Sequence, residues 1–479
     1  MFGPPLVAAA IALRGRVPMF GSLVGLYGSA AFMERECARF VERNPASRAL
    51  AERAGRNWLH GVPMFWMKDW GTPFPLFIRE ARGVTLTDVD GNAYIDFCLG
   101  DTGAMFGHAP EPVTRALRAQ SERGLTTMLP AEDAVLVGEL LTQRFGLPRW
   151  QITATASDAN RSVIRWARAA TRRDKILVFN GCYHGAVDDT FVVLENGRPR
   201  NRPGLADEVR DLTATTKVIE WNDAEALARA LSPGDVALVL AEPVMTNCGM
   251  VMPLAGYHET LRSLTRQHGT LLAIDETHTI STGPGGCTRT YGLDPDFFVL
   301  GKPVAGGIPA AVYGFTDAVE RAMQGAMGDR ASVFNGIGTT LSGNALQLAA
   351  MRAVLEEVLT DEVYVRAMPL AERLERGIAR VIAQHGLPWH AARLGLRVEF
   401  VCWPDPPRNG TESALAAKHD VERALVLFCL NRGVVITPYY NMMLVCPATR
   451  DVHVDRLVRV LDEGLAALTG RENDMQVGN

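Results

Sequence analysis

The feature that most constrains the fold is a series of short apolar runs separated by segments with helical patterning. The runs cover residues 176–179, 236–240, 271–274 and 297–300. A strand with one face in water alternates apolar and polar residues, whereas these runs are apolar throughout. Such strands are buried on both faces, which is typical of a parallel sheet covered by helices. The sequence therefore predicts an α/β fold with a mostly parallel central sheet between helices.

The two ends of the chain predict a smaller α+β unit. Strand-like residues 84–87 and 93–97 flank the dipeptide Asp90-Gly91, which is typical of a β-hairpin. After Gly343 the sequence becomes helical, and strand-like pieces and a last helix follow at 397–402, 433–437 and 454–468. We expect the hairpin to join this C-terminal part. The expected units are an extension over 1–33, a helix and hairpin over 34–100, a large domain over 101–340 and a small domain over 341–479.

Charge and cysteine content exclude several classes of protein. A formal net charge of −4 over 479 residues gives no reason to expect nucleic acid as a partner. The 8 cysteines form no C-x-x-C pair, so we expect reduced thiols in a cytoplasmic protein, with no disulfide framework and no metal site.

The N-terminal residues are apolar but do not read as a membrane span. Basic residues follow the first apolar stretch, whereas a signal peptide carries them before it. The uncharged run over 17–33 is broken by glycine and is shorter than the roughly 20 apolar residues that a span needs. We expect a loosely ordered extension and no membrane contact; Met33, which opens a helical segment, is an alternative start.

Polar side chains follow each apolar run at the point where the strand should end. They are Tyr183 and His184, Glu242, Asp275 and His278, and Lys302. In an open parallel sheet, ligands bind beyond the carboxyl ends of the strands, so we expect these groups to meet at one edge. A helix over 158–171 is preceded by Thr155, Ala156 and Ser157. Hydroxyl residues there cap the helix and can equally hold a phosphate.

This set of groups suits pyridoxal 5'-phosphate. Lys302 follows a buried strand and precedes the glycine-rich "GKPVAGGIP", and its amine could form a Schiff base with the cofactor's aldehyde. Asp275 could hold a proton on the pyridine nitrogen, which makes the ring an electron sink. Tyr183 is expected to stack on the ring, and core packing is the alternative explanation for an aromatic residue there.

Six motifs in order resemble the class III aminotransferases, in particular the subgroup of glutamate-1-semialdehyde aminomutase. They are "DVDGNAYIDF", "GCYHG", "AEPV", "LLAIDE", "LGKPVAGGIP" and "TTLSGNA", within residues 83–343, and a weaker likeness extends over 58–468. The resemblance implies the fold type I of pyridoxal phosphate enzymes and a homodimer with the cofactor at the subunit interface. It also implies roles for Lys302 as Schiff-base lysine, Asp275 at the pyridine nitrogen, 155–157 at the phosphate, Tyr183 at the ring and Thr340 at the neighbouring subunit's phosphate.

Some residues depart from the family pattern or carry a second interpretation. Ala156 stands where the family has glycine, so we expect a slightly reshaped phosphate cradle. His278 replaces a glutamine or methionine and could donate to the cofactor's phenolic oxygen. His184 is expected to be structural, and Glu242 either ties down a loop or lies near the ring. Arg397 could anchor a substrate carboxylate or be a solvated strand residue.

The predicted activity is a ping-pong transfer of an amino group between an amine or amino acid and a ketone, aldehyde or 2-oxo acid. An aminomutase or an epimerase on the same scaffold is the alternative, because the early chemistry is identical. A non-catalytic cofactor-binding protein is a further alternative. A nicotinamide-binding fold is excluded, because the "GPGG" of residues 283–286 does not open a helix after a strand.

Overall fold

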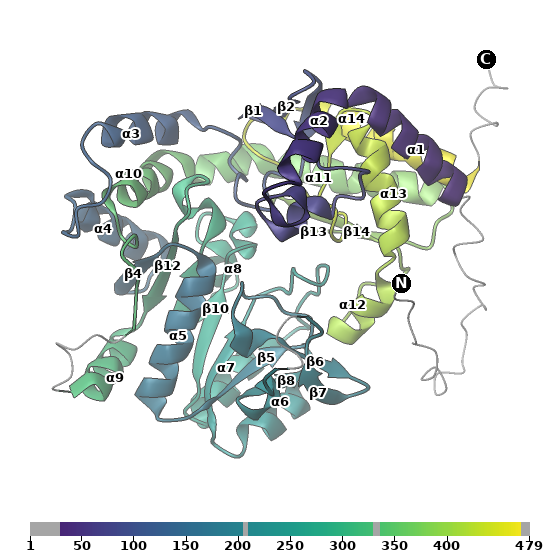
Figure 1. Cartoon of the computed structure of the whole chain (residues 1–479). Coiled ribbons are helices and arrows are strands. Elements are labelled where there is room, and N and C mark those ends of the chain that lie inside the picture. The colour runs from purple at the N-terminus through teal and green to yellow at the C-terminus, as the bar shows by residue number, and fades with distance from the viewer. Residues whose placement is uncertain (1–28, 205–208, 329–335, 471–479) are drawn as a thin grey trace.

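The computed structural model describes residues 29–204, 209–328 and 336–470 of the chain (Figure 1). The expected N-terminal extension therefore lies almost entirely outside the described residues. Within the described ranges, no helix is both long and apolar enough to cross a membrane.

The centre of the molecule is a seven-stranded sheet in the order β4-β12-β11-β10-β9-β5-β8. Only β12 runs antiparallel to its neighbours, β11 and β4, so the predicted mostly parallel sheet is confirmed. Every residue of β9, β11 and β12 is buried, which requires cover on both faces. The strands are β4 (Arg149–Thr153), β5 (Lys175–Phe179), β8 (Thr216–Ile219), β9 (Val236–Ala241), β10 (Leu271–Asp275), β11 (Phe297–Leu300) and β12 (Ala311–Phe315).

Helices between the strands supply that cover. α5 packs along β9, β11 and β12, and α6 and α7 pack on β8 and β10 (Figure 1). Their apolar side chains join those of the strands in one continuous core. The helices of this part are α3 (Glu111–Ser121), α4 (Asp133–Phe145), α5 (Ala156–Thr171), α6 (Ala224–Leu231), α7 (Tyr257–Gln267), α8 (Gly286–Thr290), α9 (Asp317–Met327) and α10 (Ala345–Ala353). β6 (Val192–Glu195) and β7 (Arg198–Asn201) form a separate two-stranded hairpin that packs beside β8.

Strand register brings the carboxyl ends of the central strands to one edge. Asp275, the last residue of β10, pairs with Val299 of β11, and Ile274 pairs with Ala241, the last residue of β9. The residues that follow β5, β9, β10 and β11 therefore share one rim, opposite the start of α5.

Two smaller sheets combine the ends of the chain. β1 (Ile78–Arg82), β2 (Thr85–Asp88) and β3 (Ala93–Asp96) form an antiparallel meander, and the short β15 (Val434–Val435) pairs in parallel with β3. The predicted hairpin is thus present, and its sheet contains a C-terminal strand. β13 (His390–Leu394), β14 (Arg397–Val401) and β16 (Met443–Leu444) form the other sheet.

The first described helix packs on the last part of the chain. α1 lies beside α13 and α14 (Figure 1). Glu36 of α1 is 1% exposed, and its carboxylate accepts hydrogen bonds from Asn431 Nδ2 at 2.8 Å and Arg432 Nη1 at 2.9 Å. The helices of this part are α1 (Ser29–Arg43), α2 (Pro45–Ala54), α11 (Asp361–Gln384), α12 (Gly410–Ala416), α13 (His419–Leu430) and α14 (Asp451–Thr469). The domain boundaries expected from the sequence remain a prediction.

Candidate active site

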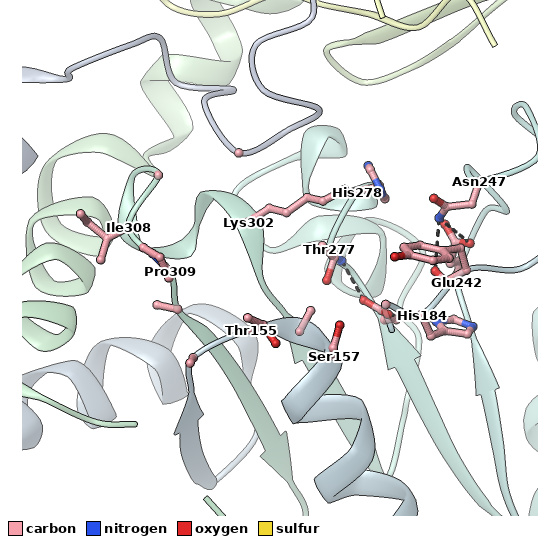
Figure 2. Close-up of a pocket in the computed structure, with 18 residues that line it drawn as sticks. Thr155, Ser157, His184, Glu242, Asn247, Thr277, His278, Lys302, Ile308 and Pro309 are labelled. Carbon is pink, nitrogen blue, oxygen red and sulfur yellow. Dashed lines mark hydrogen bonds and ion pairs between the residues drawn. The ribbon is translucent and has the colours of Figure 1, made fainter. Parts of the chain in front are cut away.

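A cavity of about 350 Å³ opens at the rim formed by the carboxyl ends of the strands. Nearly all the site residues predicted from the sequence line it, and two do not, Thr340 and Arg397. Figure 2 shows side chains that converge on it from the strand ends and from the start of α5. The predicted residues on its wall are Thr155, Ala156, Ser157, Tyr183, His184, Glu242, Asp275, His278 and Lys302.

Lys302 projects into the cavity from a tight turn. It follows β11 and begins a short 3-10 helix (Lys302–Ala305), with a left-handed φ of 46° that residues other than glycine seldom adopt. Its Nζ donates to Asp101 Oδ2 at 2.7 Å and lies 2.6 Å from His278 Nε2. The Asp101 side chain is 49% exposed. Its partial desolvation acts to raise its pKa, but the adjacent Lys302 cation lowers it to about 2. Lys302 therefore has a carboxylate partner that the sequence reasoning did not identify.

Asp275 is an ionised carboxylate at the end of β10. It is 5% exposed, and Oδ2 accepts from His184 Nδ1 and Asn160 Nδ2, both at 2.9 Å, while Oδ1 accepts from Thr277 N at 3.1 Å. Burial opposes ionisation, yet the hydrogen bond and charge of His184 lower the pKa of Asp275 to about 2. Burial acts to lower the pKa of His184, but the hydrogen bond that its ring donates to Asp275 raises this pKa to about 10. His184 and Asp275 are therefore a buried ion pair, with His184 in a supporting position.

The start of α5 forms the opposite wall. Thr155 is the N-cap residue, and its Oγ1 accepts from Asp158 N at 3.2 Å. The helix begins at Ala156, two residues before the predicted 158, so Ala156 and Ser157 lie in its first turn. Amides of a first helical turn have no partner within the helix, which makes this end attractive to an anion. Ser157 Oγ also accepts from Ala186 N at 2.9 Å.

Two glycines let the chain approach this helix start. A Cβ at Gly301 would lie 2.8 Å from the Cβ of Ala156, and a Cβ at Gly185 would overlap Ser157 Oγ. Gly185 also has a φ of 86°, which favours glycine. The space beside the backbone amides at the start of α5 therefore exists because these two positions are glycine and carry no Cβ.

Glu242 is engaged by the loop that follows it. Its carboxylate accepts from Thr246 N and from Asn247 Nδ2, each at 3.1 Å, and from the hydroxyl of Thr246. Burial raises the pKa of Glu242. These contacts fit the expectation that Glu242 ties down a loop, although its carboxylate also lines the cavity near Asn247 (Figure 2). Tyr183, whose side chain is half exposed, lies on the same wall.

Arg397 is buried behind the cavity wall, so it is not a solvated strand residue. It is 2% exposed, and its Nε donates to Glu399 Oε1 at 2.6 Å. Its Nη1 lies 3.1 Å from His278 Nδ1. Arg393, on the neighbouring strand, instead donates to Glu375 at 3.0 Å. An anchoring role for Arg397 would require the guanidinium to leave the carboxylate of Glu399.

Thr340 lies outside the Lys302 cavity. It lines a second cavity of about 830 Å³, together with Thr126, Thr127 and Thr339. Within one chain it therefore does not contact the groups around Lys302. The role implied by the resemblance, a contact with a neighbouring subunit's phosphate, remains a prediction.

Several site residues escaped the sequence reasoning. Asp101 and Thr102 follow the hairpin, where no apolar run or periodic pattern marks them. Asn160 is the second donor to Asp275, and it lies one helical turn after Ala156. Glu399 could have been predicted from the sequence. Residues two positions apart on a strand share a face, so an acid at 399 could pair with Arg397.

The residues present fit pyridoxal 5'-phosphate. The cavity has an amine at Lys302, and the ionised Asp275 lies across it, where a protonated ring nitrogen would be balanced. The amides at the start of α5 suit a phosphate, and Gly185 and Gly301 leave room beside them. One cavity thus offers groups for the aldehyde, the ring and the phosphate.

Comparisons with known proteins agree with this arrangement. The family model described as "Aminotransferase class-III" matches residues 66–460. A glutamate-1-semialdehyde 2,1-aminomutase of Sorangium cellulosum is 33% identical over 438 residues, which are 89% of this chain and 98% of that protein.

Solved structures extend the likeness to the fold. The crystal structure of a glutamate-1-semialdehyde-aminomutase from Pseudomonas aeruginosa PAO1 has a TM-score of 0.90 at 47% identity, over 91% of this chain and 98% of the other. A second crystal structure of such an aminomutase from that organism is a complex with PMP. An omega-transaminase from Sphaerobacter thermophilus has a TM-score of 0.81 at 25% identity, over 89% and 99% of the two chains. The fold is that of the fold type I enzymes, and the cofactor is pyridoxal 5'-phosphate. With the motifs, the cavity and the family match in agreement, this chain belongs to the class III aminotransferases, a family of pyridoxal phosphate-dependent enzymes.

Proposed function

We propose that the chain is an aminotransferase that moves an amino group between an amine or amino acid and a ketone, aldehyde or 2-oxo acid. The observation that carries the proposal is the Lys302 amine in the same cavity as the ionised Asp275. Bound pyridoxal phosphate supplies a cationic ring that stabilises negative charge on the substrate carbon. Every further part of the reaction falls to side chains of the chain itself.

Lys302 and Asp275 take the central roles in this proposal. Lys302 would hold the cofactor through its Nζ, and as a free amine it would move a proton at the substrate carbon, first as base and then as acid. Asp275 holds a proton at the ring nitrogen, and His184 keeps that carboxylate ionised and oriented. The first turn of α5 at Ala156 and Ser157 would bind the phosphate, and Tyr183 would pack against the ring.

Replacement of Lys302 by alanine tests the proposal. We expect a purified Lys302→Ala protein to lose the visible absorbance that borohydride bleaches in the parent enzyme, and to lose turnover by several orders of magnitude. Asp275→Asn should retain the absorbance but turn over far more slowly, because the ring nitrogen is no longer held protonated. A Lys302→Ala protein with unchanged spectrum and turnover would refute the proposal.

An intramolecular aminomutase is the second candidate. It is favoured by the names of the relatives from Sorangium cellulosum and Pseudomonas aeruginosa. Incubation with one amine and no carbonyl acceptor separates the two: a transaminase stops after one half-reaction, whereas a mutase or an epimerase turns over. Glutamate 1-semialdehyde is the mutase substrate to test, and amine donors with pyruvate or 2-oxoglutarate test transfer. If the Arg397→Ala variant loses activity only with amino donors that carry a carboxylate, Arg397 is supported as the anchor for that carboxylate.

We further propose that the chain acts as a cytoplasmic homodimer in which Thr340 completes the neighbouring site. Mixing Lys302→Ala with Thr340→Val subunits tests this arrangement. If each site takes Lys302 from one subunit and Thr340 from the other, one of the two sites in a mixed dimer has both residues, and random mixing restores about a quarter of the parent activity. If Thr340 served its own subunit, mixing would restore nothing.

A further inference from the structure

Both ring nitrogens of His278 have close neighbours. Nδ1 lies 3.0 Å from Thr102 Oγ1 and 3.1 Å from Arg397 Nη1, and Nε2 lies 2.6 Å from Lys302 Nζ. His278 is 6% exposed, so its ring is largely shielded from bulk water. The ring therefore connects the buried Arg397 to the amine in the cavity, as Figure 2 shows for Lys302 and His278.

Arg397 is held in place independently of any ligand. Its Nε donates to Glu399 at 2.6 Å and its Nη2 donates to Thr246 O at 2.9 Å. Arg397 and Glu399 are 2% and 0% exposed, and Arg397 does not line the cavity. The guanidinium is thus fixed toward Nδ1 of His278 by two further hydrogen bonds.

The direction of each hydrogen bond follows from the guanidinium, because arginine can only donate. Nδ1 of His278 must then accept, and a neutral imidazole carries its proton on Nε2. That N–H points at Lys302 Nζ, which can accept it only as a neutral amine. Lys302 in turn donates to Asp101. Burial is the largest cause that lowers the pKa of His278, to about 3, which agrees with a neutral ring.

A strained turn of the backbone over residues 99–102 places Asp101 beside Lys302 and Thr102 beside His278. Leu99, Gly100, Asp101 and Thr102 have φ values of 44°, 59°, 51° and 80°. A left-handed conformation is unfavourable for residues other than glycine and most unusual for a β-branched threonine. This turn brings the Asp101 carboxylate to Lys302 and the buried Thr102 hydroxyl to His278. Strain retained at such a position indicates a functional requirement.

We propose that Arg397 is a positioning residue that fixes the Nε2–H tautomer of His278 and so favours neutral Lys302, while Asp101 favours the ammonium form. The inference rests on the proposed role of Lys302. A lysine that takes a proton from the substrate carbon must begin as a neutral amine and end as an ammonium. His278 stabilises the first form and Asp101 the second, so the two neighbours balance the proton transfer.

Other charged and titratable groups face this network. Asp275 also acts on His278, and Asp101 Oδ1 lies 3.9 Å from its Nδ1. The negative charge of Asp101 also acts to raise the pKa values of four further groups, which are Cys98, Tyr183, Glu399 and Tyr439. None of these replaces the hydrogen bond that Arg397 donates.

Chemical modification of Lys302 tests the proposal without the cofactor. The full-length chain is freed of cofactor and treated briefly with acetic anhydride over a range of pH, and acetylation of Lys302 is measured by mass spectrometry. Only the neutral amine reacts, so the midpoint reports its protonation. We expect Arg397→Met to move the midpoint up by roughly one pH unit, the size of one lost hydrogen bond. Asp101→Asn should move it down, because the anion that favours the ammonium is gone.

Two further variants distinguish an effect on the His278 tautomer from an effect of lost charge and from destabilisation of the fold. Arg397→Met alone leaves Glu399 as a buried, unpaired acid, which can destabilise the fold. The double variant Arg397→Met with Glu399→Gln removes both charges and should show the same upward shift, because only the hydrogen bond to His278 is then lost. Arg393 lies on the neighbouring strand and donates to Glu375. The control variant Arg393→Met should therefore leave the midpoint unchanged.

The holoenzyme gives a second readout. The pH at which its visible absorbance changes should move in the same directions in these variants. An unchanged midpoint in the double variant would overturn the inference, as would a shift of equal size in Arg393→Met. Loss of carboxylate-bearing donors alone, with no change in either midpoint, would also overturn it and assign Arg397 to the substrate. A failure of the proposed function appears separately, as unchanged absorbance in Lys302→Ala.

Discussion

The contact between Gly301 and Ala156 permits a double-mutant test of how the α5 phosphate cradle is built. A methyl group added at Gly301 would lie 2.8 Å from the Cβ of Ala156, where carbon atoms in contact normally lie about 3.5–4.0 Å apart. The start of α5 must then move by roughly 1 Å. Overpacking of this kind costs about 1–3 kcal/mol, so Gly301→Ala should reduce the free energy of unfolding by that amount.

The compensating change is Ala156→Gly. With its Cβ gone, the nearest atoms to the new methyl group are Cα and N of residue 156, both at 3.5 Å, an ordinary contact. Alone, Ala156→Gly should cost about 0.5–1 kcal/mol, because glycine loses more backbone freedom in a helix. The double variant should therefore recover most of the loss caused by Gly301→Ala, with a favourable coupling of about 1–2 kcal/mol.

Chemical denaturation of the parent, both single variants and the double variant measures the coupling. The dissociation constant of pyridoxal phosphate supplies a second measure, because displacement of the α5 amides should weaken binding about tenfold for each 1.4 kcal/mol lost. If the two single effects simply add, to within about 0.5 kcal/mol, the proposed contact does not exist and the reasoning is wrong.

Four further predictions address the site, a contact behind it and the first described helix. Gly395→Ala should cost at least about 3 kcal/mol more than Gly386→Ala in denaturation, because both have a left-handed φ but only Gly395 has backbone atoms where the methyl group would lie. The pKa of His184 is raised to about 10, so its contribution is complete below about pH 6.5 and is lost toward pH 10. The free energy of unfolding should fall across that window, and His184→Gln should flatten the fall. The low pKa of Asp275, about 2, should remove stability only below about pH 3.8. Glu36→Ala should cost about 3 kcal/mol, because Arg432 then keeps only the more distant carboxylate of Glu463, 4.0 Å away. Equal melting of variant and parent would contradict this.

The central sheet and most of the cavity wall could be predicted from local sequence. Continuous apolar runs have few interpretations other than buried strands, and parallel strands must end at one edge. Sheet topology alone therefore predicts that Lys302, Asp275 and His278 lie at the same edge. The antiparallel course of β12 had no such signal, because pairing direction is set by connections and neighbours and not by composition.

Contacts between distant segments could not be predicted in the same way. Asp101 lies 201 positions from Lys302, on a left-handed turn whose strain is visible only in the folded backbone. Arg397 was expected to be either a substrate anchor or a solvated residue, because its burial depends on the facing strand and on Glu399. Thr340 lies outside the cavity of its own chain, so its predicted role requires a second copy.

The pairing of β3 with β15 imposes an order on folding during synthesis. Ile95 meets Val434, a residue that leaves the ribosome about 340 positions later. At about 5–20 residues per second, the meander β1-β2-β3 waits roughly 17–70 seconds with one strand edge unpaired. The nascent chain therefore exposes an edge that could pair with another polypeptide, and the charged residues of β1 lie at the opposite edge and do not protect it. Slower translation of the C-terminal half should consequently lower the yield of folded protein more than slower translation of the first hundred residues.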